Sequence, residues 1–187
     1  MIEIEAGCFI GVDIGSINIT EITSIIDVNK GKLLGYFLTH SHGDHTVGIK
    51  KIWELYKMPI YCSSNTSSEI NNPRKNFSIY SEEIETFSYD LPCKTVEDHE
   101  IINFGKSSFE IMHAPGHSPG CIVIFHNKSV FTGDFLMKDF KTPLNLPNSS
   151  RKDYNKSREN FKTKCSNNKL TFYPGHGKNF TEFDGMI

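Results

Sequence analysis

Apolar residues in the first third of the chain form short runs separated by one helical stripe. Residues 2–12 are apolar with interspersed glycines and predict one or two strands, and the run at residues 33–38 predicts another. Residues 17–26 are rich in β-branched side chains and fit either a strand or a helix. At residues 46–56 the apolar positions recur at helical spacing, so we expect a helix there, followed by a strand at residues 59–62.

The rest of the chain begins with a polar stretch, residues 63–75, that predicts a surface loop or one weak helix and offers poor candidates for chemistry. Four short apolar runs with turn residues between them then predict a β-meander. These runs are residues 100–104, 107–112, 121–126 and 129–132. A helix near residues 150–165 and a strand at residues 170–173 complete an α/β pattern without repeats, so we expect one domain over residues 1–187.

Charge and cysteine content narrow the partners and the location. The formal charge is −2, from 20 basic and 22 acidic side chains, which gives no electrostatic reason to expect nucleic acid, and we expect a small-molecule substrate. The N-terminal residues do not resemble a signal peptide, and we expect no membrane association. The five cysteines are odd in number and contain no CxxC pair, which favours a reducing, cytoplasmic environment.

The most specific pattern is Thr-His-Ser-His-Gly-Asp-His-Thr-Val-Gly at residues 39–48, in a loop predicted between a strand and a helix. His40 and His42 stand at i and i+2 on an extended segment, so both side chains point the same way and can reach one metal ion. Asp44 and His45 follow a flexible glycine and turn toward a second position. The spacing therefore predicts two metal ions.

Three further polar motifs follow predicted strands. They contain His117 in Pro-Gly-His-Ser-Pro-Gly, Asp134 in Phe-Thr-Gly-Asp, and His176 in Pro-Gly-His-Gly. Strand ends converge on one edge of a sheet, so these residues and the histidine cluster can form one site. Imidazole with carboxylate suits Zn²⁺, and Fe or Mn are reasonable substitutes.

From residue 33 to the C-terminus this set of motifs resembles the metallo-β-lactamase superfamily, and within it the glyoxalase II-like (hydroxyacylglutathione hydrolase-like) enzymes. The resemblance implies an αββα four-layer sandwich with the site at one edge between two sheets. It also implies the ligand assignment: one metal ion is bound by His40, His42 and His117, the other by Asp44, His45 and His176, and Asp134 bridges them.

The resemblance and the chemistry together predict a dinuclear metal-dependent hydrolase that attacks an ester, thioester or related acyl bond of a small metabolite. Two divalent ions that share one water lower its pKa from ~15.7 to near 7, so a metal-bound hydroxide is the expected nucleophile. Asp44 is expected to orient it and to manage its proton. The alternatives are a nucleotide phosphodiesterase, an iron-dependent persulfide dioxygenase and a non-catalytic metal-binding module.

Two regions depart from the glyoxalase II-like pattern. The family's Gly-Arg-Thr-Asp-Leu-Pro stretch is replaced by Thr-Pro-Leu-Asn-Leu-Pro at residues 142–147, which weakens any substrate assignment by analogy. The family's Ile-Asp-Pro-Gly or Ile-Asp-Thr-Gly turn is matched here to Ile26 and Asp27, only thirteen residues before His40. We therefore expect either a shortened connection at residues 27–34, or a helix at 17–29 with a trimmed hairpin, and a smaller first sheet. Eleven residues follow His176, too few for the helical glutathione-binding domain, so a glutathione thioester is unsupported.

Other candidate residues receive lesser roles. His113 is expected to pack beneath the site or to make a supporting hydrogen bond, and His99 and His126 are expected to be exposed turn residues. Four cations that follow the Asp134 motif are either solvated charges or an attraction for an anionic substrate; they are Lys138, Lys141, Arg151 and Lys152.

Overall fold

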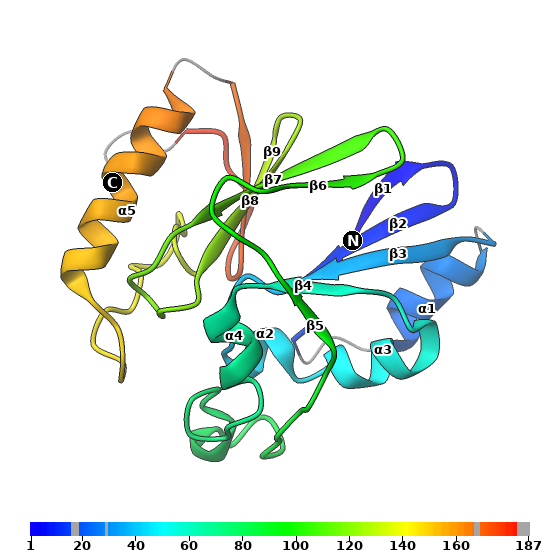
Figure 1. Cartoon of the computed structure of the whole chain (residues 1–187), viewed down its shortest axis with the longest axis horizontal. Helices are drawn as coiled ribbons and strands as arrows, with labels where there is room; N and C mark the ends of the chain where they lie inside the picture. Colours follow the sequence, from blue (N-terminus) through cyan, green and yellow to red (C-terminus); the bar gives the residue numbers. More distant parts are fainter. Residues whose placement is uncertain (16–18, 29, 167–168, 183–187) are drawn as a thin grey trace. The chain divides into compact units, whose positions relative to one another are not determined.

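The computed structural model describes residues 1–15, 19–28, 30–166 and 169–182 (Figure 1). The chain divides into two compact units, residues 1–95 and 96–187. Each unit contains one five-stranded mixed sheet with helices packed on it. No helix in the described ranges is both long and apolar enough to cross a lipid bilayer.

The sheet of the first unit begins with an antiparallel hairpin and continues with parallel strands. Its strands, in spatial order, are β1 (Ile2–Glu5), β2 (Cys8–Val12), β3 (Lys32–Phe37), β4 (Ile60–Cys62) and β5 (Cys93–Thr95). Strands β2 to β5 pair in parallel, which requires crossover connections. These connections carry α1 (Ile19–Val28), α2 (Gly43–Thr46), α3 (Ile49–Tyr56), α4 (Ser64–Glu69) and the 3₁₀ turn η1 (Ser78–Tyr80).

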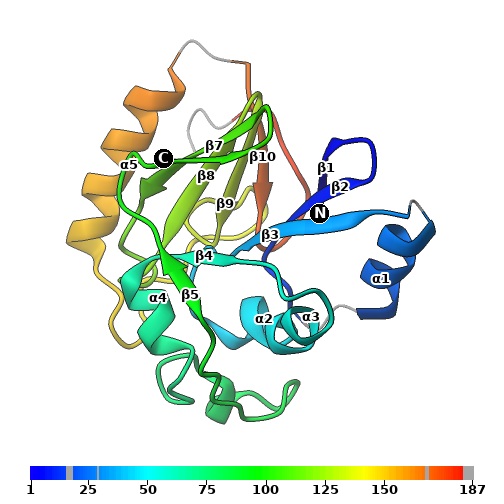
Figure 2. The same ribbon diagram turned by 45° about the vertical axis from the view of Figure 1, so that its right-hand side comes forward.

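Helices α1 and α3 bury their apolar stripes against this sheet (Figure 2). Ile22 and Ile26 of α1 and Ile52 of α3 are buried in the same cluster as Tyr36 and Ile60 of the sheet. The residues between 17 and 26, ambiguous in sequence, are therefore helical from residue 19, because the i and i+4 isoleucines face the sheet together. Residues 17, 18 and 29 of the expected helix lie outside the described ranges.

The second unit is a β-meander completed by one crossover. Its sheet has the order β10 (Thr171–Pro174), β9 (Ser129–Gly133), β8 (Ile122–His126), β7 (Ser107–His113) and β6 (Ile101–Phe104). Neighbours from β6 to β9 are antiparallel, whereas β10 runs parallel to β9 after the helix α5 (Arg151–Cys165). Strands β7, β9 and β10 therefore point the same way, and their C-terminal ends share one edge.

Most predicted elements are confirmed, including the helix that was one of the two expectations for residues 63–75, and two differences are informative. Strand β5 was not predicted, because Cys-Lys-Thr has no apolar alternation. The polar stretch at residues 63–75 contains α4, which begins at a cap where the Ser63 hydroxyl accepts a hydrogen bond from the Thr66 N–H. His126 is buried rather than exposed, because its ring stacks on Phe109 with centroids 4.3 Å apart.

The core of the second unit depends on α5, whose Phe161 is fully buried against Phe135 and Phe172. Phe161→Ala is expected to lower the free energy of unfolding by about 3–5 kcal/mol, because it removes buried area and leaves a cavity. Urea unfolding followed by circular dichroism measures this. Ile101→Ala, at a strand position that is 56% exposed, is the control and should cost less than about 1 kcal/mol. Equal losses in the two variants would contradict the packing described here.

Candidate metal centre

The histidine cluster occupies the turn that connects β3 to α2. His40 and His42 follow the strand, and the one-turn helix α2 carries Asp44 and His45. The ring centroid of His40 lies 4.5 Å from that of His42 and 4.2 Å from that of His45. All three imidazoles are buried, whereas the Asp44 side chain is 53% exposed, with its Oδ2 3.7 Å from His45 Nε2. The first unit therefore gathers all four predicted residues of this motif.

Asp13, which the sequence analysis overlooked, holds this cluster in place from the end of β2. Its Oδ1 accepts a hydrogen bond from the Thr39 N–H at 2.8 Å, and its Oδ2 accepts one from the Thr39 hydroxyl at 2.7 Å. The same Oδ2 lies 2.9 Å from His45 Nδ1. Because a carboxylate oxygen is an acceptor, His45 carries its proton on Nδ1 and presents the Nε2 lone pair.

A second hydrogen bond fixes the tautomer of His40. The Thr39 hydroxyl donates to Asp13, so it accepts from His40 Nδ1, 3.0 Å away. His40 therefore also presents its Nε2 lone pair, the form that a metal ion requires. One ligand atom each from Asp13, His40 and His45 lies within 4.8 Å of the others.

The turn at residues 12–15, Val-Asp-Ile-Gly, contacts the histidine cluster, whereas Ile26 and Asp27, matched above to the family turn, lie on α1. The Ile14 N–H donates to the His45 carbonyl at 2.8 Å. A Cβ on Gly15 would lie 2.1 Å from the Asp44 carbonyl oxygen, so only glycine fits this approach. Asp27 is instead exposed on α1, the helix for which little room was expected. The Asp-x-Gly sequence directly after the apolar run of β2 is the sequence feature that could have identified Asp13.

The polar region after β4, whose residues 63–75 were expected to be poor candidates for chemistry, contacts the cluster in a supporting role. The buried carboxylate of Glu69 accepts a hydrogen bond from the Ser41 hydroxyl at 2.8 Å. The Gly43 N–H donates to the Asn76 carbonyl at 2.7 Å. The ring of Phe77 lies 4.6 Å from that of His42, centroid to centroid. These contacts fix the backbone between the predicted ligands.

The second unit gathers the other three predicted residues at the common edge of β7, β9 and β10. Asp134 Oδ2 lies 3.6 Å from His117 Nε2 and 3.7 Å from His176 Nε2. These separations exceed hydrogen-bond length, but two ligand atoms bound tetrahedrally to one Zn²⁺ lie about 3.4 Å apart. One carboxylate oxygen between two imidazole nitrogens is the arrangement expected of a bridging ligand.

His117 is held by the loop that follows Asp134 and by α5. Its Nδ1 lies 2.9 Å from the Pro143 carbonyl, which can only accept, so Nδ1 carries the proton and Nε2 presents its lone pair. Gly116 has φ +151°, and a Cβ there would lie 2.5 Å from the Tyr154 Cα. The backbone can therefore pass this close to α5 only as glycine, and the Gly116 carbonyl accepts a hydrogen bond from the Ser150 N–H at 2.7 Å.

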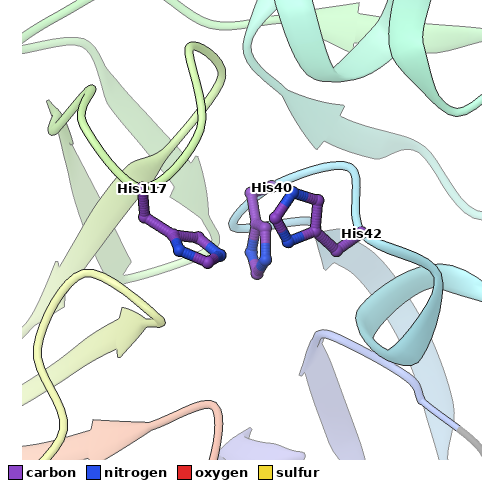
Figure 3. Close-up of side chains that lie close together, drawn as sticks. All are labelled: His40, His42 and His117. Carbon is purple, nitrogen blue, oxygen red and sulfur yellow. The ribbon is translucent and has the colours of Figure 1, made fainter. Parts of the chain in front are cut away.

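His113 does not contribute a ligand atom to this cluster. Its Nε2 lies 3.0 Å from the Val96 carbonyl, so its hydrogen bond goes to the backbone and not to a predicted metal ligand. Figure 3 draws His40 and His42 on the loop after β3 and His117 on the loop between β7 and β8. The donor sets of both units, imidazole Nε2 atoms with carboxylate oxygens, fit Zn²⁺, Fe or Mn.

Comparison with known proteins establishes the family. The family model described as "Metallo-beta-lactamase superfamily" matches residues 21–176, which span parts of both units. The chain therefore belongs to the metallo-β-lactamase superfamily, as the motifs indicated.

Two curated relatives are hydrolases by name. The "Probable polyketide biosynthesis zinc-dependent hydrolase PksB" of Bacillus subtilis is 24% identical over 161 residues, covering 84% of this chain and 63% of that protein. A hydroxyacylglutathione hydrolase of Francisella tularensis subsp. novicida is 31% identical over 110 residues, covering 58% of this chain and 36% of the relative. The matched part is thus less than two thirds of either relative's length.

Solved structures confirm the metallo-β-lactamase fold. The B3 metallo-β-lactamase BLEG-1 superposes with a TM-score of 0.85 at 21% identity, over 96% of this chain and 88% of that one. A protein crystallised in a di-iron-bound form superposes with a TM-score of 0.78 at 23% identity, over 91% and 82% of the two chains. The fold has two mixed five-stranded sheets with flanking helices, so the first sheet retains its initial hairpin.

Asp13→Asn is expected to weaken Zn²⁺ binding by about 10–100-fold, because an amide cannot accept all three hydrogen bonds that orient Thr39 and His45. Competition with a chromophoric chelator measures the affinity. Asp27→Asn, an exposed change on α1, is the matched control and should leave it unchanged. An unaltered affinity in a folded Asp13→Asn protein would show that Asp13 does not orient the ligands.

Proposed function

We propose that the protein is a dinuclear metal-dependent hydrolase that cleaves an ester, thioester or related acyl bond of a small metabolite. The observation that carries the proposal is the pair of histidine–carboxylate clusters, one in each unit, with imidazoles oriented by acceptors on Nδ1. In this proposal one ion is held by His40, His42 and His117 and the other by Asp44, His45 and His176, with Asp134 common to both.

Two divalent ions held in this way supply a water of lowered pKa and an electrophile that polarises the substrate carbonyl. The chain's own residues determine the geometry and the proton transfers. Asp13 and Pro143 hold the Nδ1 protons of His45 and His117, so each ring is oriented to offer Nε2 as its ligand atom. The exposed carboxylate of Asp44, next to His45, is placed to accept a proton at Oδ2 as the nucleophile forms and to return it to the leaving group.

The relatives support hydrolysis more directly than they support one substrate. Both curated relatives are named as hydrolases, one of them zinc-dependent and the other acting on a hydroxyacylglutathione. Their names cover proteins longer than the matched segment, so the proposal stays with the class of acyl bond, and thioesters serve as the test substrates.

Metal removal and ligand substitution test this function. The chelator-treated protein should lose hydrolysis of acyl thioesters and regain it on addition of about two equivalents of Zn²⁺, Fe²⁺ or Mn²⁺. His42→Ala is expected to reduce kcat/KM by more than about 100-fold and to lower the metal content measured by plasma emission spectroscopy. His99→Ala, whose side chain is 71% exposed, is the matched control. A chelated protein that keeps full activity, or His42→Ala with wild-type rates, would refute the proposal.

The role of Asp44 is tested separately. Asp44→Asn removes the proton acceptor and is expected to lower kcat by roughly 10²-fold or more, the usual contribution of general acid–base catalysis. Rates should be compared at matched metal occupancy, so that the loss of a ligand is distinguished from the loss of a base. Asp153→Asn, an exposed change in the first turn of α5, is the control. An unchanged kcat at equal occupancy would remove Asp44 from the proton transfer.

A further inference from the structure

The second unit contains a cavity of about 880 Å³ between the loop at residues 136–145 and the helix α5. The loop connects the Asp134 motif to the helix that packs against the His117 turn. Arg151, Tyr154 and Arg158 line the cavity from α5. All lining residues belong to this one unit, so the cavity is defined by the second unit alone.

The charge in this cavity is unbalanced. Its cationic lining residues are Lys138, Lys141, Arg151 and Arg158, and its one carboxylate is Asp139. Three of these cations were noted in sequence; Arg158 was not, and Lys152 does not line the cavity. Within the described ranges, none of the four cations has an ion-pair partner, and Asp139 already accepts a hydrogen bond from the Lys178 N–H at 3.4 Å.

Arg158 gives the clearest indication of a missing ligand. Its Nε is buried and has no hydrogen-bond partner among the described residues. The guanidinium carbon lies 5.8 Å from the centroid of the Tyr154 ring, which places the group beside that ring. A buried donor without an acceptor is unfavourable, and a guanidinium is best satisfied by an oxygen anion that bonds in a bidentate manner.

The cavity adjoins the metal half-site of the second unit through two backbone contacts. Pro143 lines the cavity and accepts the hydrogen bond from His117. Asp139 lines it as well, and Lys178, whose N–H it binds, stands two residues after His176. A ligand in the cavity would therefore lie beside the residues proposed to hold the reacting centre.

We propose that this cavity binds an anionic oxygen group of the substrate, a carboxylate or a phosphate, through the guanidinium groups of Arg151 and Arg158. Lys138 and Lys141 raise the local anion concentration and add charge at the rim. The substrate assignment rests on the proposed hydrolase function, whereas the anion-binding site itself does not. The protein is thereby assigned an acyl substrate with an anionic tail.

Binding can be measured without turnover by NMR titration of the metal-loaded protein with three thioethers that differ only in the tail. These are 3-(propylthio)propionate, 2-(propylthio)ethyl phosphate and the neutral 2-(propylthio)ethanol. At low ionic strength at least one anionic compound should bind about tenfold or more tightly than the neutral one, since charge-assisted hydrogen bonds are the strong ones. The tighter of the two anions identifies carboxylate or phosphate as the natural group.

The Arg151→Gln/Arg158→Gln variant should lose this preference and keep its affinity for the neutral thioether. Lys152→Gln/Lys156→Gln removes the same charge from α5 at positions that do not line the cavity, and it should retain the preference. Equal affinity for all three compounds in the wild-type protein would overturn the proposal. So would a preference that survives the arginine changes, or one that is lost equally in the lysine variant.

The corresponding S-acetyl thioesters separate this proposal from the hydrolase function. The wild-type protein should show a lower KM for the preferred anionic thioester, and the arginine variant should raise that KM with little effect on the neutral substrate. Preferential binding of an anionic thioether without hydrolysis of any thioester would refute the proposed function and leave the anion site standing. Hydrolysis at equal KM for all three thioesters would support the proposed function and refute the anion site.

Discussion

The carboxylate of Asp13 is the constraint on which the histidine cluster of the first unit depends. It accepts hydrogen bonds from the Thr39 N–H and hydroxyl and lies 2.9 Å from His45 Nδ1, so one side chain orients the whole turn after β3. The parallel register of β2 and β3 brings it there, since Val12 pairs with Phe37. Burial, and then the Asp13 charge, raise the pKa of Tyr36, whose neutral phenol donates to the Asp13 carbonyl at 3.0 Å.

The cluster of the second unit is organised by strand direction rather than by one carboxylate. Because β7, β9 and β10 point the same way, the turns after them bring His117, Asp134 and His176 to one edge. Hydrogen bonds between the strands therefore determine where these turns lie. A site whose ligands are held by the surrounding fold loses less conformational entropy on binding.

The sequence alone predicted the features that depend on residues close together along the chain. The strand-to-helix turn that carries the histidines and the meander each have a short-range pattern, and both elements lie where they were predicted. What it missed depends on distant pairing: Asp13 acts on Thr39, 26 positions away, and Glu69 acts on Ser41, 28 positions away. Arg158 was overlooked for the same reason, because its buried nitrogen and its place beside Tyr154 arise only when α5 packs on its sheet.

The carbonyl of Pro143 couples the binding of a metal ion to the binding of an anion in the cavity. It accepts a hydrogen bond from His117 Nδ1–H and also forms part of the cavity wall, so one residue contacts both the predicted metal ligand and the proposed anion site. A ligand that moved Pro143 would change its hydrogen bond with His117 Nδ1. That hydrogen bond influences how strongly His117 Nε2 donates electrons to a metal ion. Linkage is reciprocal: if an anion in the cavity changes the free energy of metal binding, the metal ion changes the free energy of anion binding by the same amount.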